Sequence, residues 1–282
     1  LLVEAGQGLE KTDSLKAAKF YEDASAISKD AEDISKLILA SAMLYERNGK
    51  SDKAHDLFKR YLLSDAIPIE NEAEARYRLG RIQFEAGSKA EGVEILTPLM
   101  EWKGKIDDQL IAKASLLVLQ ERQERYLKIK LIPPFEETLQ KKTMLLEALL
   151  KEYADVARYR ILELQPEVFY QMGVILENFR DSIINSERPK DLTQEEIEEY
   201  NFLLEEKAYP YDEEAVKAYE KSVQAGWKHH TIFVNRSLER LADLRPALYK
   251  REFEKKWMKP IFIYPEVVAL EDKDLINPQV TQ

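Results

Sequence analysis

The chain has 282 residues, of which 45% are hydrophobic and 33% are charged, and its net charge is −10 at pH 7. This length is enough to bury a sizeable core, either in one elongated domain or in two compact ones. An acidic chain is repelled by the phosphate backbone, so nucleic acid is disfavoured as a partner. Because cysteine is absent, disulfides, zinc–thiolate sites and a thiol nucleophile are excluded.

The composition favours helices throughout. Leu, Ala, Glu and Lys dominate, only 9 Gly and 11 Pro are present, and period-two alternation is nearly missing outside "IFIYP" at residues 261–265. No apolar run reaches the roughly 18 residues that a membrane-spanning helix needs. We therefore predict an all-α protein with no transmembrane segment.

Two capping boxes are predicted from a hydroxyl residue followed three positions later by Glu. The first pairs Ser88 with Glu91, and the second pairs Thr193 with Glu196. Each would begin a helix at the residue after the Ser or Thr.

Prolines mark the boundaries of the central helices. A helix is predicted from Asp107 to about Leu131, since the prolines at 133–134 disfavour helix before them. Pro166 suits the first turn of a helix that ends near Arg180.

A pattern of small and large residues occurs twice in the first third of the chain. The two copies are Ala42, Gly49, Ala54, Phe58 and Tyr61, and then Gly80, Gly87, Gly92, Leu96 and Leu99. In a helical hairpin the small residues let the helices approach closely, the middle glycine allows a turn with positive φ, and the large residues fill the remaining space. The alternative is that two unrelated hairpins align by chance.

This order of positions resembles the tetratricopeptide repeat, a 34-residue pair of helices. The resemblance implies a solenoid of helical hairpins with a right-handed superhelix, in which residues 1–104 form such hairpins and residues 105–165 form an irregular long one. "SLKAAKFYEDASAI" at 14–27 looks like the second helix of a further pair, whose first helix is expected before residue 1.

The segment "YPYDEEAVKAYEKSVQAG" carries half of the same pattern. Asp212 is predicted to cap a helix that Gly226 closes, with Ala215 and Tyr219 at the small and large positions. Its first helix is expected in "PEVFYQMGVILENFR" at 166–180, which leaves an insertion between the two halves.

Residues 166–249 are therefore predicted to form one repeat-like unit, with an inserted acidic helix within 181–211 and a closing helix in "NRSLERLADLRPALY". About 85 residues of this half resemble the end of large periplasmic tetratricopeptide proteins of Gram-negative bacteria, including ones linked to gliding-motility machinery. The matching segments include the "LTQEE" insertion, "EEAVKAYEKSV" and "LERLADLRP".

Residues 250–282 are predicted to form a C-terminal helix and an extended tail. "YKREFEKKWMKP" has more cations than anions, with Phe253 and Trp257 on one face. This segment could bind anionic lipid or an acidic partner, but the aromatic residues could equally cover the open end of a solenoid.

The sequence offers little for catalysis or cofactor binding. The chain has three histidines, His55, His229 and His230, and the neighbouring pair His229 and His230 lacks a third ligand at suitable spacing. Neither a Gly-rich phosphate loop nor a nucleophile elbow is present. We predict a non-enzyme with no cofactor and no metal.

A solenoid of this kind exposes a concave face lined by the first helices of its pairs. We predict partner contacts there from Lys36, Arg47, Tyr77, Arg81, Phe84, Tyr170 and Glu177. Arg47, Tyr77 and Arg81 are the strongest candidates, because Arg and Tyr are enriched at binding hot spots. Tetratricopeptide domains that clamp a C-terminal carboxylate have lysine and asparagine where this chain has Leu39 and Met43, so that binding mode is disfavoured.

These observations favour a non-catalytic scaffold that binds a protein or peptide within a periplasmic or envelope assembly, with possible peripheral association with the envelope. A cytoplasmic location is the alternative. Two other functions stay open: a structural spacer within a longer solenoid, and an all-helical enzyme acting on glycans.

Overall fold

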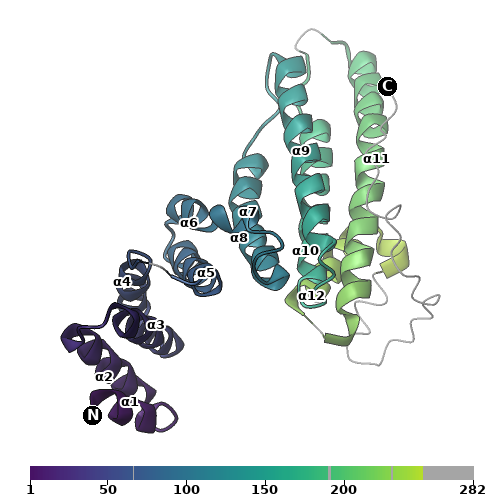
Figure 1. The fold of residues 1–282 in the computed structure, drawn as a ribbon. Helices are drawn as coiled ribbons and strands as arrows, with labels where there is room; N and C mark the ends of the chain where they lie inside the picture. The colour runs from purple at the N-terminus through teal and green to yellow at the C-terminus, as the bar shows by residue number, and fades with distance from the viewer. Residues whose placement is uncertain (66, 190–191, 230, 250–282) are drawn as a thin grey trace. The chain divides into compact units, whose positions relative to one another are not determined.

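The computed structural model describes residues 1–65, 67–189, 192–229 and 231–249. They form twelve α-helices and one 3-10 helix, and no strand occurs among them (Figure 1). The all-α prediction is confirmed for this part of the chain. The predicted C-terminal helix and tail, including "IFIYP", lie outside the described residues.

The chain divides into two compact units, Leu1–Glu121 (unit 1) and Arg122–Gln282 (unit 2). The division falls inside helix α8, Asp108–Leu127, which ends four residues earlier than predicted from Pro133 and Pro134. The two units are described separately below.

The helices of unit 1 pack successively along the chain and are joined by short connections, with α1 on α2, α2 on α3, α3 on α4, α4 on α5 and α5 on α6. They are α1 Leu2–Leu9, α2 Ser14–Ile27, α3 Ala31–Arg47, α4 Ser51–Tyr61, α5 Ile69–Glu85, α6 Lys89–Leu96, α7 Pro98–Glu101 and the first part of α8. Asp13 and Asp30 cap α2 and α3 by accepting bonds from backbone N–H groups three residues later.

Small residues allow close helix contacts in these pairs. A Cβ added to Gly80 would lie 2.5 Å from Cγ of Leu96, and one added to Gly6 would lie 2.6 Å from Cε1 of Tyr21. The second contact corrects a prediction, because α1 already packs on α2 as the first helix of the pair, which was expected before residue 1.

The connections within the pairs confirm one prediction and contradict another. Gly49 and Gly87 adopt positive φ of 68° and 88°, as expected of helix-ending glycines. The predicted capping box at Ser88 is wrong, since its side chain makes no cap bond. Instead, the carboxylate of Glu91 accepts a bond from the side chain of Gln83 at 3.0 Å.

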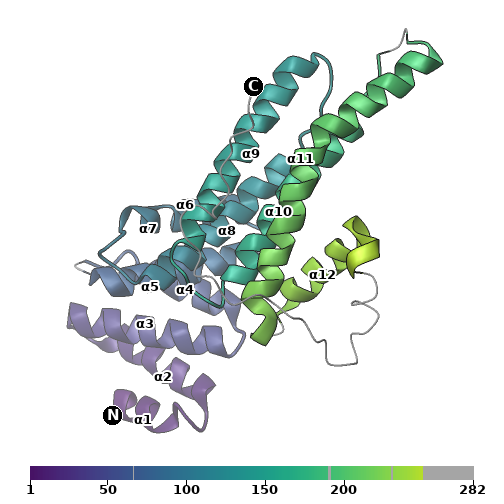
Figure 2. The same cartoon turned by 90° about the vertical axis from the view of Figure 1, so that its right-hand side faces the viewer.

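Unit 2 contains the last helices, α9 Phe135–Ala157, α10 Gln165–Ile184, α11 Gln194–Gly226, the 3-10 helix Trp227–His229 and α12 Ile232–Leu244. α10 packs against both α9 and α11, and α12 packs on α10 and α11 (Figure 2). Pro166 lies in the first turn of α10 and Thr193 forms the predicted capping box with Glu196.

The insertion is not a separate helix. α11 runs without interruption for 33 residues and contains Pro210 in its interior. Asp212 therefore lies inside a helix, and the prediction that it caps one is wrong. The predicted pairing of the two halves is present: a Cβ on Gly173 of α10 would lie 2.5 Å from the ring of Tyr219, the predicted large position on α11.

Each unit buries apolar side chains of its own. Unit 1 has two clusters, one built from α1 to α5 and one from α5 to α8. Within unit 2, Tyr126, Tyr153 and Tyr219 are at most 1% exposed.

Candidate functional site

The seven predicted contact residues occupy three helices. Lys36 and Arg47 lie on α3, Tyr77, Arg81 and Phe84 lie on α5, and Tyr170 and Glu177 lie on α10. The first five belong to unit 1 and the last two to unit 2, so two surfaces must be considered separately.

Two of the predicted residues are open to solvent. Arg47 is exposed at the end of α3. Lys36 is also exposed, and its ammonium group lies 2.6 Å from Glu32 one turn earlier. An exposed pair of this kind contributes little to stability, so Lys36 can exchange Glu32 for a partner at small cost.

Arg81 has a structural role that the sequence does not reveal. It forms an ion pair with Glu46 of α3, whose side chain is only 7% exposed, and Arg78 pairs with the same carboxylate. Tyr77 lies beside this cluster, and burial raises the pKa of its hydroxyl. Reversing the charge of Arg81 would place two carboxylates together, so it would test folding rather than binding.

Phe84 and Glu177 are buried, with 8% and 7% exposure, contrary to the expectation that they line an open face. Phe84 fills the space beside Gly92, where an added Cβ would lie 2.5 Å from its ring. Both side chains belong to the packing between helices.

Glu177 holds α12 onto α10 and α11. Its carboxylate accepts a bond from the Tyr219 hydroxyl at 2.8 Å and pairs with the guanidinium group of Arg240. Tyr170 is half-buried, with its ring centroid 5.8 Å from that of Tyr219 and 5.6 Å from that of Phe233. On α10, the carboxylate of Glu177 is therefore engaged inside the fold, while the ring of Tyr170 stays partly exposed.

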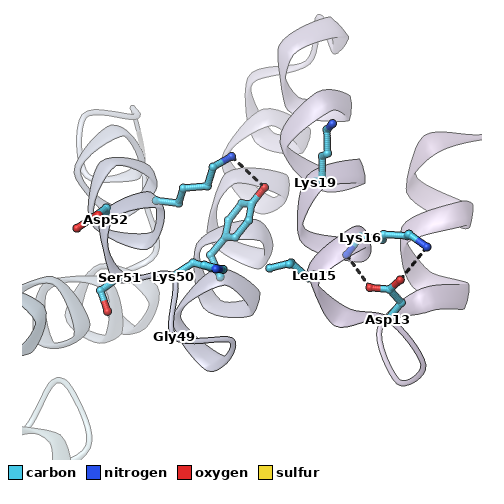
Figure 3. A pocket seen from close by; sticks show the side chains of 10 residues that line it. Asp13, Leu15, Lys16, Lys19, Gly49, Lys50, Ser51 and Asp52 are labelled. Atoms are coloured by element: carbon cyan, nitrogen blue, oxygen red, sulfur yellow. Dashed lines mark hydrogen bonds and ion pairs between the residues drawn. The ribbon is translucent and has the colours of Figure 1, made fainter.

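The structure instead shows a groove in unit 1 that the sequence analysis did not predict (Figure 3). Its volume is about 900 Å³, and we call it the lysine groove. It is lined by Asp13, Leu15, Lys16, Lys19, Tyr45, Gly49, Lys50, Ser51, Asp52 and Lys53. The residues come from the start of α2, the end of α3, the glycine turn and the start of α4.

Polar contacts between side chains link the three helices of the groove. The Tyr45 hydroxyl of α3 donates to Glu22 of α2 at 2.8 Å, and the ammonium group of Lys53 on α4 lies 3.4 Å from that hydroxyl and 3.5 Å from Glu22. The hydroxyl of Ser14 donates a hydrogen bond to the side-chain oxygen of Asn48 at 3.1 Å. The walls are therefore fixed by the fold.

The four lysines of the groove differ in how they are engaged. Lys16 pairs with Asp13 at 3.0 Å (Figure 3), and the hydrogen bond to Tyr45 and the charge of Glu22 raise the pKa of Lys53. Lys19 and Lys50 are exposed and have no ion-pair partner within the described part of the chain. Their spacing of three residues from Lys16 and Lys53 is the signal in the sequence that could have indicated the groove.

Metal binding finds no support in the described ranges, where no group of three or more His, Asp or Glu side chains could hold an ion. His55 is engaged otherwise: its Nδ1 lies 3.0 Å from Asp56 and its Nε2 lies 2.9 Å from the Gln83 amide.

None of the helices in the described part of the chain is both long and apolar enough to span a bilayer. Neither the family models nor the curated proteins compared with this chain give a match.

Proposed function

We propose that the chain is a non-catalytic scaffold of tetratricopeptide type that binds a protein partner, and that it works within a bacterial envelope assembly. The observation that carries the proposal is the repeated contact between a small residue on one helix and a large one on the next. Gly6 meets Tyr21, Gly80 meets Leu96 and Gly173 meets Tyr219. Repetition of one such contact is typical of stacked helix pairs.

A second small residue supports the same interpretation. Ala17, Gly92 and Ala215 each precede the large residue of their helix by four positions, one helical turn, and all three are buried. The chain thus uses the same device in both units to bring helices close together. Location in the envelope rests on the resemblance of residues 165–249 alone.

The partner surface in unit 1 is proposed to lie on the exposed parts of α3 and α5. Lys36 and Arg47 are exposed cations on α3, and Tyr77 of α5 offers a half-buried ring beside the Arg81 cluster. Arg and Tyr contribute strongly to binding when a partner excludes water from them.

The test is affinity capture from an envelope extract, comparing the unchanged chain with Lys36→Glu/Arg47→Glu. A protein that binds the unchanged chain should be lost from the variant. The control is Lys29→Glu/Lys59→Glu, which makes the same change of charge at exposed positions elsewhere in unit 1. Equal capture by all three chains would reject this surface, and no capture at all would favour the structural spacer.

A further inference from the structure

We infer that the lysine groove binds an extended acidic segment of a partner protein through the side-chain carboxylates of consecutive Asp and Glu residues. The inference rests on the proposed function only in taking the partner to be a protein. It concerns a surface different from the α3 and α5 face.

The charge of the groove contrasts with that of the chain. Four of its ten lining residues are lysines and two are aspartates, whereas the whole chain has a net charge of −10. A positive patch on an acidic protein attracts anionic ligands to that place, while the negative charge of the remaining surface disfavours their binding elsewhere. Opposite charges across an interface also set which partner binds.

The lysines stand on two walls. Lys16 and Lys19 lie on α2, while Lys50 and Lys53 lie at the start of α4, with the glycine turn at Gly49 between α3 and α4. In an extended peptide, successive side chains point to opposite sides. A run of acidic residues would therefore present carboxylates to both walls at once.

The groove also has groups that suit a peptide rather than a simple anion. Leu15 lines the groove, is 40% exposed and can contact an apolar side chain of the ligand. The exposed hydroxyl of Ser51 can donate a hydrogen bond to a backbone carbonyl. Lys19 and Lys50 need not leave an existing ion pair before they bind.

Nucleic acid fits the groove poorly. The lining contains no arginine, the residue that binds phosphate with two parallel hydrogen bonds. Its one aromatic residue, Tyr45, is 3% exposed and cannot stack on a base.

The groove also differs from the clamp that tetratricopeptide domains use for a C-terminal carboxylate. That clamp would involve Leu39 and Met43, which are not among the lining residues. The ligand inferred here needs no chain terminus, so an internal acidic segment serves equally well.

The experiment measures the fluorescence anisotropy of a labelled ten-residue peptide that alternates Glu and Asp around one central Leu. Its C-terminus is amidated, so that all its carboxylates are side-chain carboxylates. The full chain should bind it saturably at low salt. Replacing every Glu and Asp by Gln and Asn should weaken binding by about tenfold or more, and raising the salt should weaken it progressively.

The variant Lys19→Glu/Lys50→Glu should also bind at least about tenfold more weakly, because each substitution replaces attraction by repulsion. Lys29→Glu/Lys59→Glu, which changes the net charge equally outside the groove, should bind as the unchanged chain does. Circular dichroism should show the same helix content in all three proteins.

Equal loss in both variants would overturn the inference, because it would show attraction by overall charge. Tighter binding of a labelled single-stranded oligonucleotide, lost in the groove variant, would overturn it in favour of nucleic acid. If the peptide fails to bind while Lys36→Glu/Arg47→Glu still loses a captured protein, the groove inference fails and the proposed function stands.

Discussion

Lys142 is the most unusual single residue of unit 2. It is 0% exposed, and its ammonium group donates to the Ile129 carbonyl, to Asn178 and to Ser182 at 2.7 to 2.8 Å. All three acceptors are uncharged, and the ring centroid of Tyr126 lies 4.9 Å away. Burial without a carboxylate lowers the pKa of Lys142 to about 8.

The free energy of unfolding should therefore depend on the charge of Lys142. In the unfolded chain a lysine titrates near 10.5. Between about pH 8 and 10 the unfolded state then binds more protons than the folded state, so stability should rise with pH by up to about 1.4 kcal/mol per pH unit. Denaturant titrations at several pH values would measure this slope.

The matched pair of variants is Lys142→Met and Lys141→Met, since Lys141 is an exposed neighbour on the same helix. The slope should disappear in Lys142→Met and persist in Lys141→Met. A slope that survives in Lys142→Met would assign it to other groups.

Gly173 gives a second prediction at this scale. A Cβ there would lie 2.5 to 2.8 Å from three atoms of the Tyr219 ring, so Gly173→Ala should destabilise the protein by about 1–3 kcal/mol despite the better helix propensity of Ala. Gly8→Ala is the control, because nothing lies within 4 Å of its Cβ. It should be neutral or stabilising in thermal unfolding, and a similar effect of both substitutions would contradict the packing argument.

Residues whose contacts lie within a few positions in the sequence could be predicted in part, since the capping-box pattern held at Thr193 and failed at Ser88. Residues whose contacts lie on distant helices could not be predicted. The capping box of Thr193 needs only Glu196, and it formed. Phe84 is buried against Gly92 on the next helix. Lys142 is buried among hydrogen-bond acceptors that lie up to 40 residues away in the sequence. No local pattern distinguishes such a lysine from one facing solvent.

At the scale of elements, α12 is held by charged contacts. Arg240 pairs with buried Glu177, and Arg245 pairs with Asp212 at 2.6 Å and also with Glu213. The predicted closing helix is thus present, but the helix-capping role expected of Asp212 is replaced by an ion pair between helices.

Arg240→Met should destabilise unit 2 by about 2–5 kcal/mol, because it leaves the carboxylate of Glu177 buried without its closest cation. Arg236→Met on the same helix removes an exposed charge and should have little effect. Chemical denaturation would measure both.

A second substitution separates the ion pair from general damage to α12. Glu177→Gln combined with Arg240→Met should recover part of the loss, since Gln still accepts the Tyr219 hydroxyl bond and carries no charge. A double variant less stable than Arg240→Met would show that Glu177 acts in some other way.

Helix pairs were predictable where their connection is short and contains glycine, as at Gly49 and Gly87. The sequence did not indicate that the insertion and the following helix form one continuous helix, because Pro210 locally favours a break. Burial from Ala208 onward, including the contact of Tyr211 with Phe179 at 4.5 Å between ring centroids, outweighs the hydrogen bond that proline removes.

At the scale of the whole molecule, the chain contains several separate cores rather than one. Unit 1 has two clusters and unit 2 packs its own helices around α10. We expect thermal unfolding in more than one step, with a calorimetric enthalpy larger than the van't Hoff enthalpy. One transition with equal enthalpies would show that the clusters unfold together.

The sequence indicates an all-helical chain with repeated contacts, but it does not indicate where the compact units divide. The division lies within the continuous helix α8, with no glycine or proline at Glu121 and Arg122. The place of the division depends on which side chains pack against each half of α8. Such packing is a property of the tertiary structure alone.

The long helix α11 has one more consequence. From Gln194 to Lys207 no residue is buried, whereas Ala208 and seven of the positions after it up to Gly226 are buried. A glutamate-specific protease should therefore nick this helix early, at residues such as Glu198 or Glu205, while the two fragments stay together under native conditions.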